Sequence, residues 1–521
     1  MFMEKKMNLL RQISDAETML IIAIVTLVFL YFLSRFRRKN HPPGPKGLPF
    51  IGNMMIANQI SQIGLAKLAN QYGGIFRVKL PFLNTVVVSS PDLARQVLQV
   101  QDNIFSNRPA TIAISYLTYE RADMAFAQYG PMWRQMRKLC VMKLFSSKRA
   151  ASWDAVRDEV DDMIRVLDSR AGLPVNLGKL FFRLSRKIIY RAAFGSRTPE
   201  RQDEFIQILQ EISTLLNAFN LADFIPWLKW ADLQGFNKRL ISSRASLDAF
   251  IDSITEDHME KKKNVNGSFD QVEGDMVDEL LAFMGDDEGK VTEAGNLQKS
   301  LRLTKNNVKA LIMDAMFGGT ETVGSAIEWI MTELIKNPND LKRVQEELAN
   351  VVGLHRKVQE SDMNKLTYFK SCFKEVLRLH PPIPLLLHET MEDSEVAGYH
   401  IPAKSRVMVN VWAIGRNKDT WGEDADTFKP SRFLSNGAPD YKGSNFEFIP
   451  FGSGRRSCPG MQLGLFAVEM AVAHLLHCFQ WELPDGMKPS DVDTNDVFGL
   501  AAPRASRLVA VPTPRLLCPL V

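Results

Sequence analysis

Most of the chain after residue 48 shows the spacing of amphipathic helices. Between residues 154 and 167, for example, apolar side chains recur every three or four positions. Runs with strand character are few: residues 76–80 and 85–88 flank a turn and predict a hairpin, and residues 406–411 form a further β-rich run. The pattern predicts a mainly α body with small β-sheets.

The N-terminal region has a different pattern. Residues 18–33 are sixteen residues without a charge, which as a helix would span about 24 Å of a hydrocarbon core of roughly 30 Å. A cleaved signal peptide is the alternative, but no small-x-small site follows the apolar run, and a basic cluster lies on its C-terminal side. We therefore expect an N-terminal transmembrane helix, with the rest of the chain on the cytosolic side.

A basic and proline-rich stretch follows this helix. Its prolines fix φ and favour an extended spacer. Since no later stretch has the composition of an interdomain linker, the chain is expected to divide into three parts. These are a membrane anchor at residues 1–34, a hinge at residues 35–47 and one catalytic domain at residues 48–521.

Charge and cysteine content exclude two classes of protein. Four of the five net positive charges come from Arg35, Arg37, Arg38 and Lys39, and the charges of residues 1–34 cancel, so residues 41–521 carry about +1. A nucleic-acid binder would need a strongly basic domain. Five widely spaced cysteines without a C-x-x-C pair argue against a disulfide scaffold or a zinc ribbon and fit a reducing compartment.

The strongest chemical signal is the Gly-rich stretch 451–460, which ends in Ser-Cys-Pro-Gly and precedes an apolar helical run, 461–478. A cysteine just before a helix N-terminus is favoured as a thiolate and can ligate a metal; a buried free cysteine is the alternative reading. The stretch resembles the haem-binding loop of the cytochromes P450 at five positions. These are Phe451, Gly454, Arg456, Cys458 and Gly460. The resemblance implies the P450 fold and haem b with Cys458 as the iron ligand.

A second motif is the E-x-x-R pair of Glu375 and Arg378, three positions apart on one helical face. As a lone signal it is weak, because most such pairs are solvated surface contacts. The resemblance adds Arg432 as a third member, and it implies that the triad is structural and holds the loop that carries the cysteine.

A third motif lies in a long helical segment, residues 304–337, which contains three glycines at 318, 319 and 324. Glycines inside a helix cost about 1 kcal/mol each relative to alanine, and close helix packing is one explanation. The other is a locally loosened turn over the haem. The resemblance implies that Glu321 and Thr322 are the acid and the alcohol that deliver protons during dioxygen activation.

The haem propionates are expected to bind a set of cationic and aromatic side chains. Trp133 and Arg137 lie four apart on one helical face, an arrangement that also suits simple stacking of a guanidinium on an indole. The resemblance implies that the propionates are held by Trp133, Arg137, His388 and Arg456.

Membrane anchoring places the chain, by resemblance, in the microsomal class of the family. That class implies O2 as a substrate, electrons from NADPH through NADPH-cytochrome P450 reductase, and a single-pass location in the endoplasmic reticulum membrane. Two alternatives come from other classes: a haem-thiolate isomerase or dehydratase, and a non-catalytic haem sensor or carrier. The Glu321–Thr322 pair argues against the isomerase or dehydratase. The sensor or carrier would need neither this pair nor a reductase, and consumption of NADPH on addition of reductase distinguishes it.

Four segments carry a more specific resemblance: residues 94–98, 105–119, 382–387 and 515–520. They resemble the plant P450s that hydroxylate guaiacyl phenylpropanoids (coniferaldehyde, coniferyl alcohol or ferulate) at ring position 5, toward syringyl lignin. A flavonoid ring hydroxylase is the alternative. Plausible wall residues of an apolar pocket, each equally consistent with ordinary core, are Met313, Phe317, Ile383, Leu385 and Phe498.

Overall fold

The computed structural model describes residues 26, 40–48, 51–81, 83–145, 150–195, 199–218, 220–225, 229–230, 232–264, 275–284, 302–484 and 486–520. The expected membrane anchor, residues 1–34, lies outside the described residues apart from Thr26. Among the described helices, Met461–Cys478 is long and apolar enough to cross a membrane, but 72% of it is buried inside the fold. It is therefore a core helix and not the expected anchor.

The described part of the expected hinge is bound to the body. The Arg77 N–H donates to the carbonyl of Pro43 at 2.7 Å, and the His400 N–H donates to the carbonyl of Asn40 at 2.6 Å. The rings of His41 and His400 lie 5.4 Å apart. Residues 40–43 are thus held against the catalytic domain by backbone hydrogen bonds.

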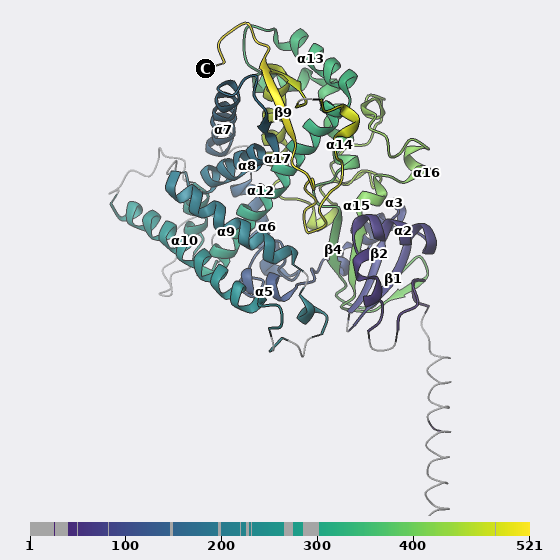
Figure 1. The fold of residues 1–521 in the computed structure, drawn as a ribbon. Coiled ribbons are helices and arrows are strands. Elements are labelled where there is room, and N and C mark those ends of the chain that lie inside the picture. The colour runs from purple at the N-terminus through teal and green to yellow at the C-terminus, as the bar shows by residue number, and fades with distance from the viewer. Residues whose placement is uncertain are drawn as a thin grey trace, which may run out of the picture.

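Helices make up most of the body, as the periodicity predicts (Figure 1). They are α2 (Gln62–Tyr72), α3 (Pro91–Arg95), α4 (Asp102–Phe105), α5 (Ile112–Leu117), α6 (Pro131–Leu139), α7 (Ala150–Asp168), α8 (Leu177–Phe194), α9 (Pro199–Asn217), α10 (Phe236–Asn264), α11 (Met276–Ala282), α12 (Lys305–Lys336), α13 (Pro338–Val352), α14 (Thr367–Leu379), α15 (Val411–Ile414), α16 (Lys418–Trp421) and α17 (Met461–Cys478). Helix α11 begins with a capping box at Asp275.

The strands form small sheets, also as expected. They are β1 (Ile75–Leu80), β2 (Leu83–Val88), β3 (Val175–Asn176), β4 (Leu385–Glu389), β5 (Ser394–Val396), β6 (Tyr399–Ile401), β7 (Arg406–Asn410), β8 (Phe479–Glu482) and β9 (Val509–Pro514). The largest sheet has the order β1-β2-β7-β4 and contains the predicted hairpin, β1 paired antiparallel with β2. The second has the order β3-β9-β8, and β5 pairs with β6.

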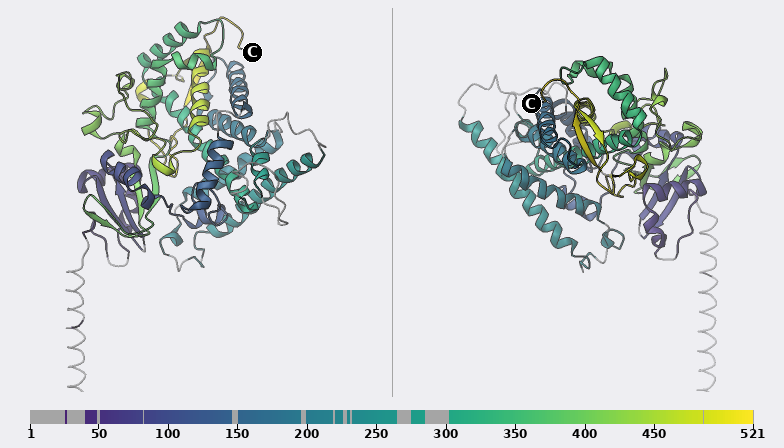
Figure 2. Two further views of the ribbon diagram at one scale, coloured as in Figure 1. Left: turned by 180° about the vertical axis from the view of Figure 1, so that it is seen from behind. Right: turned by 45° about the horizontal axis from the view of Figure 1, so that its top comes forward.

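The sheet and the helices occupy different sides of the molecule. The strands β1 and β2 lie beside α2 at one end, and α9 and α10 cover the opposite side (Figure 1). Figure 2 shows the same arrangement from two further directions, with the C-terminal segment in yellow between the two sides.

Helix α12 runs through the middle of the fold and joins two hydrophobic clusters. It begins with a capping box, in which Thr304 Oγ1 accepts from the Asn307 N–H at 3.1 Å. Its first half, residues 308–316, packs with α9, α10 and α11, and its second half, residues 323–335, packs with α14 and α17. Between the halves lies the short stretch that contains the Glu321–Thr322 pair.

Candidate active site

The loop that carries Cys458 is a tight turn fixed by backbone hydrogen bonds. The Cys458 N–H donates to the carbonyl of Phe451 at 2.9 Å, and the Ser457 N–H to that of Gly454 at 3.2 Å. Gly454 has a φ of 67°, in the left-handed region that glycine tolerates, and a Cβ there would overlap the carbonyl of Leu98. The loop therefore needs glycine at this position, and it presents Cys458 just before α17, as the sequence predicted.

The Cys458 side chain is exposed although its loop is anchored in the fold. Although the side chain is accessible, the protein atoms packed around it desolvate the thiolate and raise the pKa of the thiol, while the Gly460 N–H and the guanidinium of Arg137 act in the opposite direction. The helix terminus alone does not keep this cysteine ionised. A bound metal ion would, since a coordinating thiol loses its proton.

Arg137 connects α6 to this loop. Its Nη2 donates to the Ser457 carbonyl at 2.8 Å and to Ser457 Oγ at 3.1 Å. The Trp133 ring lies close to two guanidiniums, with Arg456 at 4.1 Å and Arg137 at 5.6 Å from its centroid. Its indole N–H donates to the Met124 carbonyl at 2.9 Å. The structure thus brings three of the four expected propionate residues together.

His388 and one further cation complete this group. His388 Nδ1–H donates to the Phe105 carbonyl at 2.8 Å. Burial and the charges of Arg108 and Arg456 hold the pKa of His388 well below its usual range, so the ring is neutral. Arg108 contacts the carbonyls of Leu387 and Arg456. The sequence alone did not predict a role for Arg108, although this residue lies within residues 105–119, one of the segments that resemble the plant hydroxylases.

The cluster holds more positive than negative charge. Burial and the neighbouring guanidinium of Arg137 lower the pKa of Arg108 to about 10. Burial and Arg108 lower the pKa of Arg456 to about 9. Such depressed values mark guanidiniums held without enough anionic partners, so two carboxylates placed among them would be stabilised. The residues present therefore fit a haem whose two propionates lie in this cluster.

The middle of α12 presents the only accessible face of an otherwise buried helix stretch, residues 310–335. Gly318 is exposed, whereas Phe317, Glu321 and Thr322 are half-buried. Thr322 Oγ1 donates to the Gly318 carbonyl at 2.6 Å. A Cβ at Gly318 would meet no atom within 4 Å. This face leaves room for a flat group.

The expectation of a loosened turn in α12 is wrong, because the helix runs unbroken from Lys305 to Lys336. Two of its glycines serve close packing instead. A Cβ at Gly319 would overlap Ile189 Cδ1 on α8, and one at Gly324 would lie 3.1 Å from Phe182 Cγ. Packing against α8, rather than an opened helix, offsets the cost of these glycines.

Glu321 pairs with a cation on α8. Its Oε1 lies 3.9 Å from Arg186 Nη2. Burial raises the pKa of Glu321, while the charges of Arg186 and Arg507 act to lower it. Glu321 and Thr322 are consecutive helix positions, which do not face each other.

The triad residues meet in the core as the motif suggested. Arg378 Nε and Nη2 donate to the two carboxylate oxygens of Glu375, both at 2.7 Å, and both side chains are fully buried. Arg432 Nε lies 3.4 Å from Glu375 Oε1. The Lys429 N–H donates to the same oxygen at 2.9 Å. Glu375 thus fastens the segment 429–432 to α14.

The expected pocket residues fall into separate surroundings. Met313 and Phe317 share a hydrophobic cluster with α5, whereas Leu385 packs in another. Ile383 is half-buried, and Phe498 is 49% exposed. The Ala502 N–H donates to the Pro382 carbonyl at 2.9 Å, which brings the Phe498 loop beside residues 382–387. None of the five expected pocket residues lines the cavity of about 100 Å³ that lies between α10, α11 and α12.

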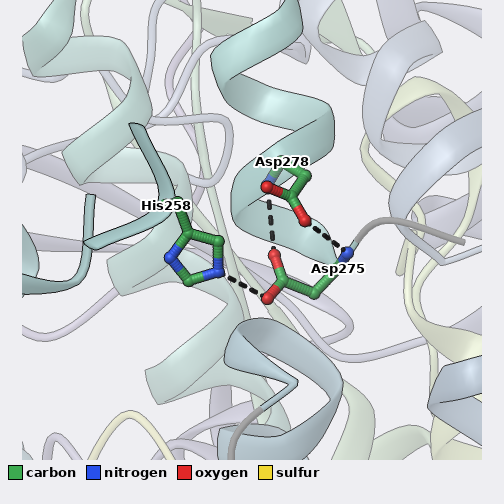
Figure 3. Close-up of side chains that lie close together, drawn as sticks. All are labelled: His258, Asp275 and Asp278. Atoms are coloured by element: carbon green, nitrogen blue, oxygen red, sulfur yellow. Dashed lines mark hydrogen bonds and ion pairs between the residues drawn. The ribbon is translucent and has the colours of Figure 1, made fainter. Parts of the chain in front are cut away.

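A second group of potential metal ligands lies far along the chain from Cys458 (Figure 3). His258, Asp275 and Asp278 converge where α10 meets the start of α11. Both ring nitrogens of His258 face acceptors, Nδ1 the Ile254 carbonyl at 2.7 Å and Nε2 the Asp275 carboxylate at 2.6 Å. Only a doubly protonated ring satisfies both, so this is an ion pair that closes the helix cap rather than a metal site.

The geometry agrees with the comparisons to known proteins. The family model for cytochrome P450 matches residues 42–509. This chain belongs to the cytochrome P450 family. It is 62% identical over 513 residues to cytochrome P450 84A1 of Arabidopsis thaliana, covering 98% of each chain. It is 38% identical to premnaspirodiene oxygenase of Hyoscyamus muticus, covering 95% of this chain and 98% of that one.

Solved structures agree on the fold. A zebrafish cytochrome P450 determined with abiraterone superimposes with a TM-score of 0.72 at 27% identity, covering 87% of this chain and 99% of that one. The chain is therefore a haem-thiolate monooxygenase, an oxidoreductase of the family that holds haem through a cysteine and receives NADPH-derived electrons through a reductase.

Proposed function

We propose that this P450 hydroxylates the aromatic ring of guaiacyl phenylpropanoids at position 5, with coniferaldehyde, coniferyl alcohol and ferulate as the substrate class. The observation that carries the proposal is the resemblance of residues 94–98, 105–119, 382–387 and 515–520 to plant ferulate/coniferaldehyde 5-hydroxylases. Identity of 62% with a plant P450 over nearly the whole chain supports a plant enzyme.

The position of two of these segments supports a role in substrate selection. Ala113 and Leu117, from residues 105–119, pack in one cluster with Met313 of α12. Residues 382–387 lead into β4 and are bonded to the Phe498 loop. Both segments therefore adjoin α12 or the loop expected to form the pocket, and an apolar wall there would orient a flat phenol.

The haem would be held by Cys458 at the iron and by three guanidiniums and a neutral histidine at the propionates. Arg456, Arg137, Arg108 and His388 would line the propionate side, and Trp133 lies close to two of the guanidiniums. When bound, the haem supplies the activation of dioxygen. His388 can donate to a propionate from Nε2 only after taking up a second proton, because Nδ1–H is committed to Phe105.

The protein's own part in the chemistry is to move protons and to orient the substrate. Thr322 Oγ1 is bonded to the Gly318 carbonyl and keeps lone pairs free to hold a water. Glu321, whose pKa burial raises, is the nearest acid in sequence to supply that water with a proton. The half-buried Phe317 side chain, one turn earlier, would face the substrate ring.

We further propose that the enzyme is anchored in the endoplasmic reticulum membrane by residues 1–34, with the catalytic domain in the cytosol and NADPH-cytochrome P450 reductase as its redox partner. The uncharged run 18–33 and the basic cluster that follows it support this topology.

The test is turnover by the full chain in microsomes with reductase and NADPH. The substrate panel contains coniferaldehyde, coniferyl alcohol, ferulate and a flavanone, and products are identified by mass spectrometry. Microsomes that carry Cys458→Ser are the matched control for haem-thiolate chemistry. We expect 5-hydroxylated guaiacyl products that require both NADPH and Cys458.

The other outcomes distinguish the alternatives. Turnover of the flavanone with no 5-hydroxylated product from a guaiacyl substrate would refute the substrate assignment and leave the monooxygenase class intact. Product formation without NADPH consumption would point to an isomerase or dehydratase.

A further inference from the structure

Two carboxyl groups outside the expected machinery, one fully buried on Asp123 and one half-buried on Asp314, lie between α12 and the loop that follows α5. Asp314 is on α12, one residue after Met313, and Asp123 is on the loop. The two carboxyls bind successive N–H groups of residues 124–126, and each shifts the pKa of the other. Asp123 Oδ1 is buried and has no hydrogen-bond partner; a proton on one of the two carboxyls would allow a hydrogen bond between them.

The remaining oxygens fix the loop. Asp314 Oδ2 accepts from the N–H groups of Met124 at 2.8 Å and Ala125 at 3.1 Å. Asp123 Oδ2 accepts from the Phe126 N–H at 2.9 Å. Three successive backbone N–H groups thus donate hydrogen bonds to this pair of carboxyls.

The carbonyl groups of the same loop accept hydrogen bonds from side chains of the propionate cluster. The Met124 carbonyl accepts from Arg456 Nη1 at 3.0 Å and from the Trp133 indole N–H at 2.9 Å, and the Ala127 carbonyl accepts from Arg456 Nη2. Each of these peptide groups is held in place, directly or through its neighbour, by Asp123 or Asp314. The carboxyl pair therefore acts on Arg456 through the backbone.

The loop is strained and needs such fastening. Tyr119, Glu120 and Arg121 have successive φ values of 56°, 58° and 66°, all left-handed. Each costs roughly 1–2 kcal/mol relative to the right-handed region, and such strain persists only where the surroundings over-determine it. Tyr119 OH donates to Asp248 on α10 at 2.7 Å, which holds the start of the loop.

We infer that Asp123 and Asp314 share one proton and that this acid–carboxylate pair is a positioning device for Arg456 and Trp133, toward the haem propionates. The inference rests on the P450 site and not on the substrate. The proton resides on Asp314, because Asp123 faces the guanidiniums of Arg108, Arg121 and Arg456. The remaining negative charge stays inside the cation cluster.

The charged and titratable surroundings agree with this assignment. Burial and the Asp123 carboxyl raise the pKa of Asp314 well above its usual range, and burial raises that of Asp123 to about 6. The groups that face the pair are Arg121 on the same loop, Arg108 and Arg456 across it, and Cys140 at the C-terminal end of α6. Burial raises the pKa of the Cys140 thiol, so it adds no charge near neutral pH.

Infrared spectroscopy tests the shared proton directly. The full chain, haem-loaded and labelled with ¹³C-aspartate, is compared at neutral pH with Asp314→Asn and Asp123→Asn. We expect the wild type to show the C=O band of a protonated aspartic acid and both variants to lack it. A band of unchanged strength in Asp314→Asn, or no band in the wild type, would overturn the inference.

Hydrogen exchange at the Met124 and Ala125 amides tests the linkage. In Asp314→Asn the amide nitrogen replaces the acidic O–H, so the closed loop no longer takes up a proton. The opening constant is the equilibrium constant between the closed and the open loop. The wild-type opening constant divided by that of Asp314→Asn should rise by up to about tenfold per pH unit above about pH 4. Because both proteins are measured at the same pH, the intrinsic exchange rates of the amides cancel in this ratio. A ratio independent of pH would mean that both carboxyls are ionised and would refute the shared proton.

The haem reduction potential tests the positioning role. Asp314→Asn keeps the Asp123 charge and should leave the potential close to that of the wild type, whereas the double variant Asp123→Asn/Asp314→Asn should shift it to more positive values. Asp314→Ala removes the acceptor for Met124 and should loosen the haem, with rescue by Asp314→Asn. Equal shifts in the single and double Asn variants, or a failure of Asn to rescue, would count against the inference.

Discussion

Replacement of Glu375 by glutamine tests the strongest buried interaction near the cysteine loop. Glu375 has no exposed surface, and its two oxygens accept from Arg378 Nε and Nη2 and from the Lys429 N–H. In Glu375→Gln the amide NH2 would face a guanidinium N–H, donor against donor. The variant also leaves the buried charge of Arg378 with only carbonyl partners, those of Gly415, Ala425 and Thr427.

The expected cost is large. Removal of one partner of a buried ion pair costs about 3–5 kcal/mol, a factor of about two to four orders of magnitude in the unfolding constant. That is a sizeable part of the roughly 5–15 kcal/mol that stabilises an ordinary protein. Arg432→Gln should cost less, about 1–2 kcal/mol, because Arg432 is partly exposed and its second partner, Asp424, is 42% exposed.

The assay is urea unfolding of the full chain in detergent, followed by tryptophan fluorescence and the Soret band. The fraction of haem-loaded protein, from the carbonyl difference spectrum, supplies a second measurement if Glu375→Gln accumulates poorly. The reasoning would be refuted if Glu375→Gln were within about 1 kcal/mol of the wild type, or if Arg432→Gln were equally destabilised.

Three further predictions concern the site and the helix cap. Cys458→Ser should abolish the red-shifted carbonyl Soret band of the reduced protein; retention of that band would remove the assigned iron ligand. Thr322→Ala should keep haem binding and divert more NADPH to peroxide or water, measured against Thr320→Ala, whose buried hydroxyl bonds the Met316 carbonyl on the same helix; equal coupling in both variants would contradict the proposed role. Although burial lowers it, the Asp275 carboxylate raises the pKa of His258 above its usual value, so the stability that His258 contributes is present below about pH 6.5 and lost as pH rises through the folded-state value; a stability difference between wild type and His258→Gln that grows with pH would disprove this sign.

The sequence by itself determined the elements and motifs that depend on local spacing. The period of apolar residues set α7, α12, α14 and α17, and alternation set the β1–β2 hairpin, because each periodicity reflects one face turned to the core. The ten residues around Cys458 specify their own turn, since the glycine at 454 is required by backbone geometry within that loop. The Glu375–Arg378 contact follows from an i, i+3 spacing.

Only the tertiary structure decided which distant side chains meet. Arg108 joins Arg456 across 348 positions of the chain, and Asp314 meets the loop at Met124 across 190; no local period encodes such pairs. The glycines of α12 were open to two explanations because a sequence does not show what a missing Cβ would touch, and the packing of Ile189 and Phe182 resolved the matter at Gly319 and Gly324. Protonation follows the same rule: the ionisation of Asp314, His388 and Cys458 depends on burial and neighbouring charge, and both are properties of the folded chain.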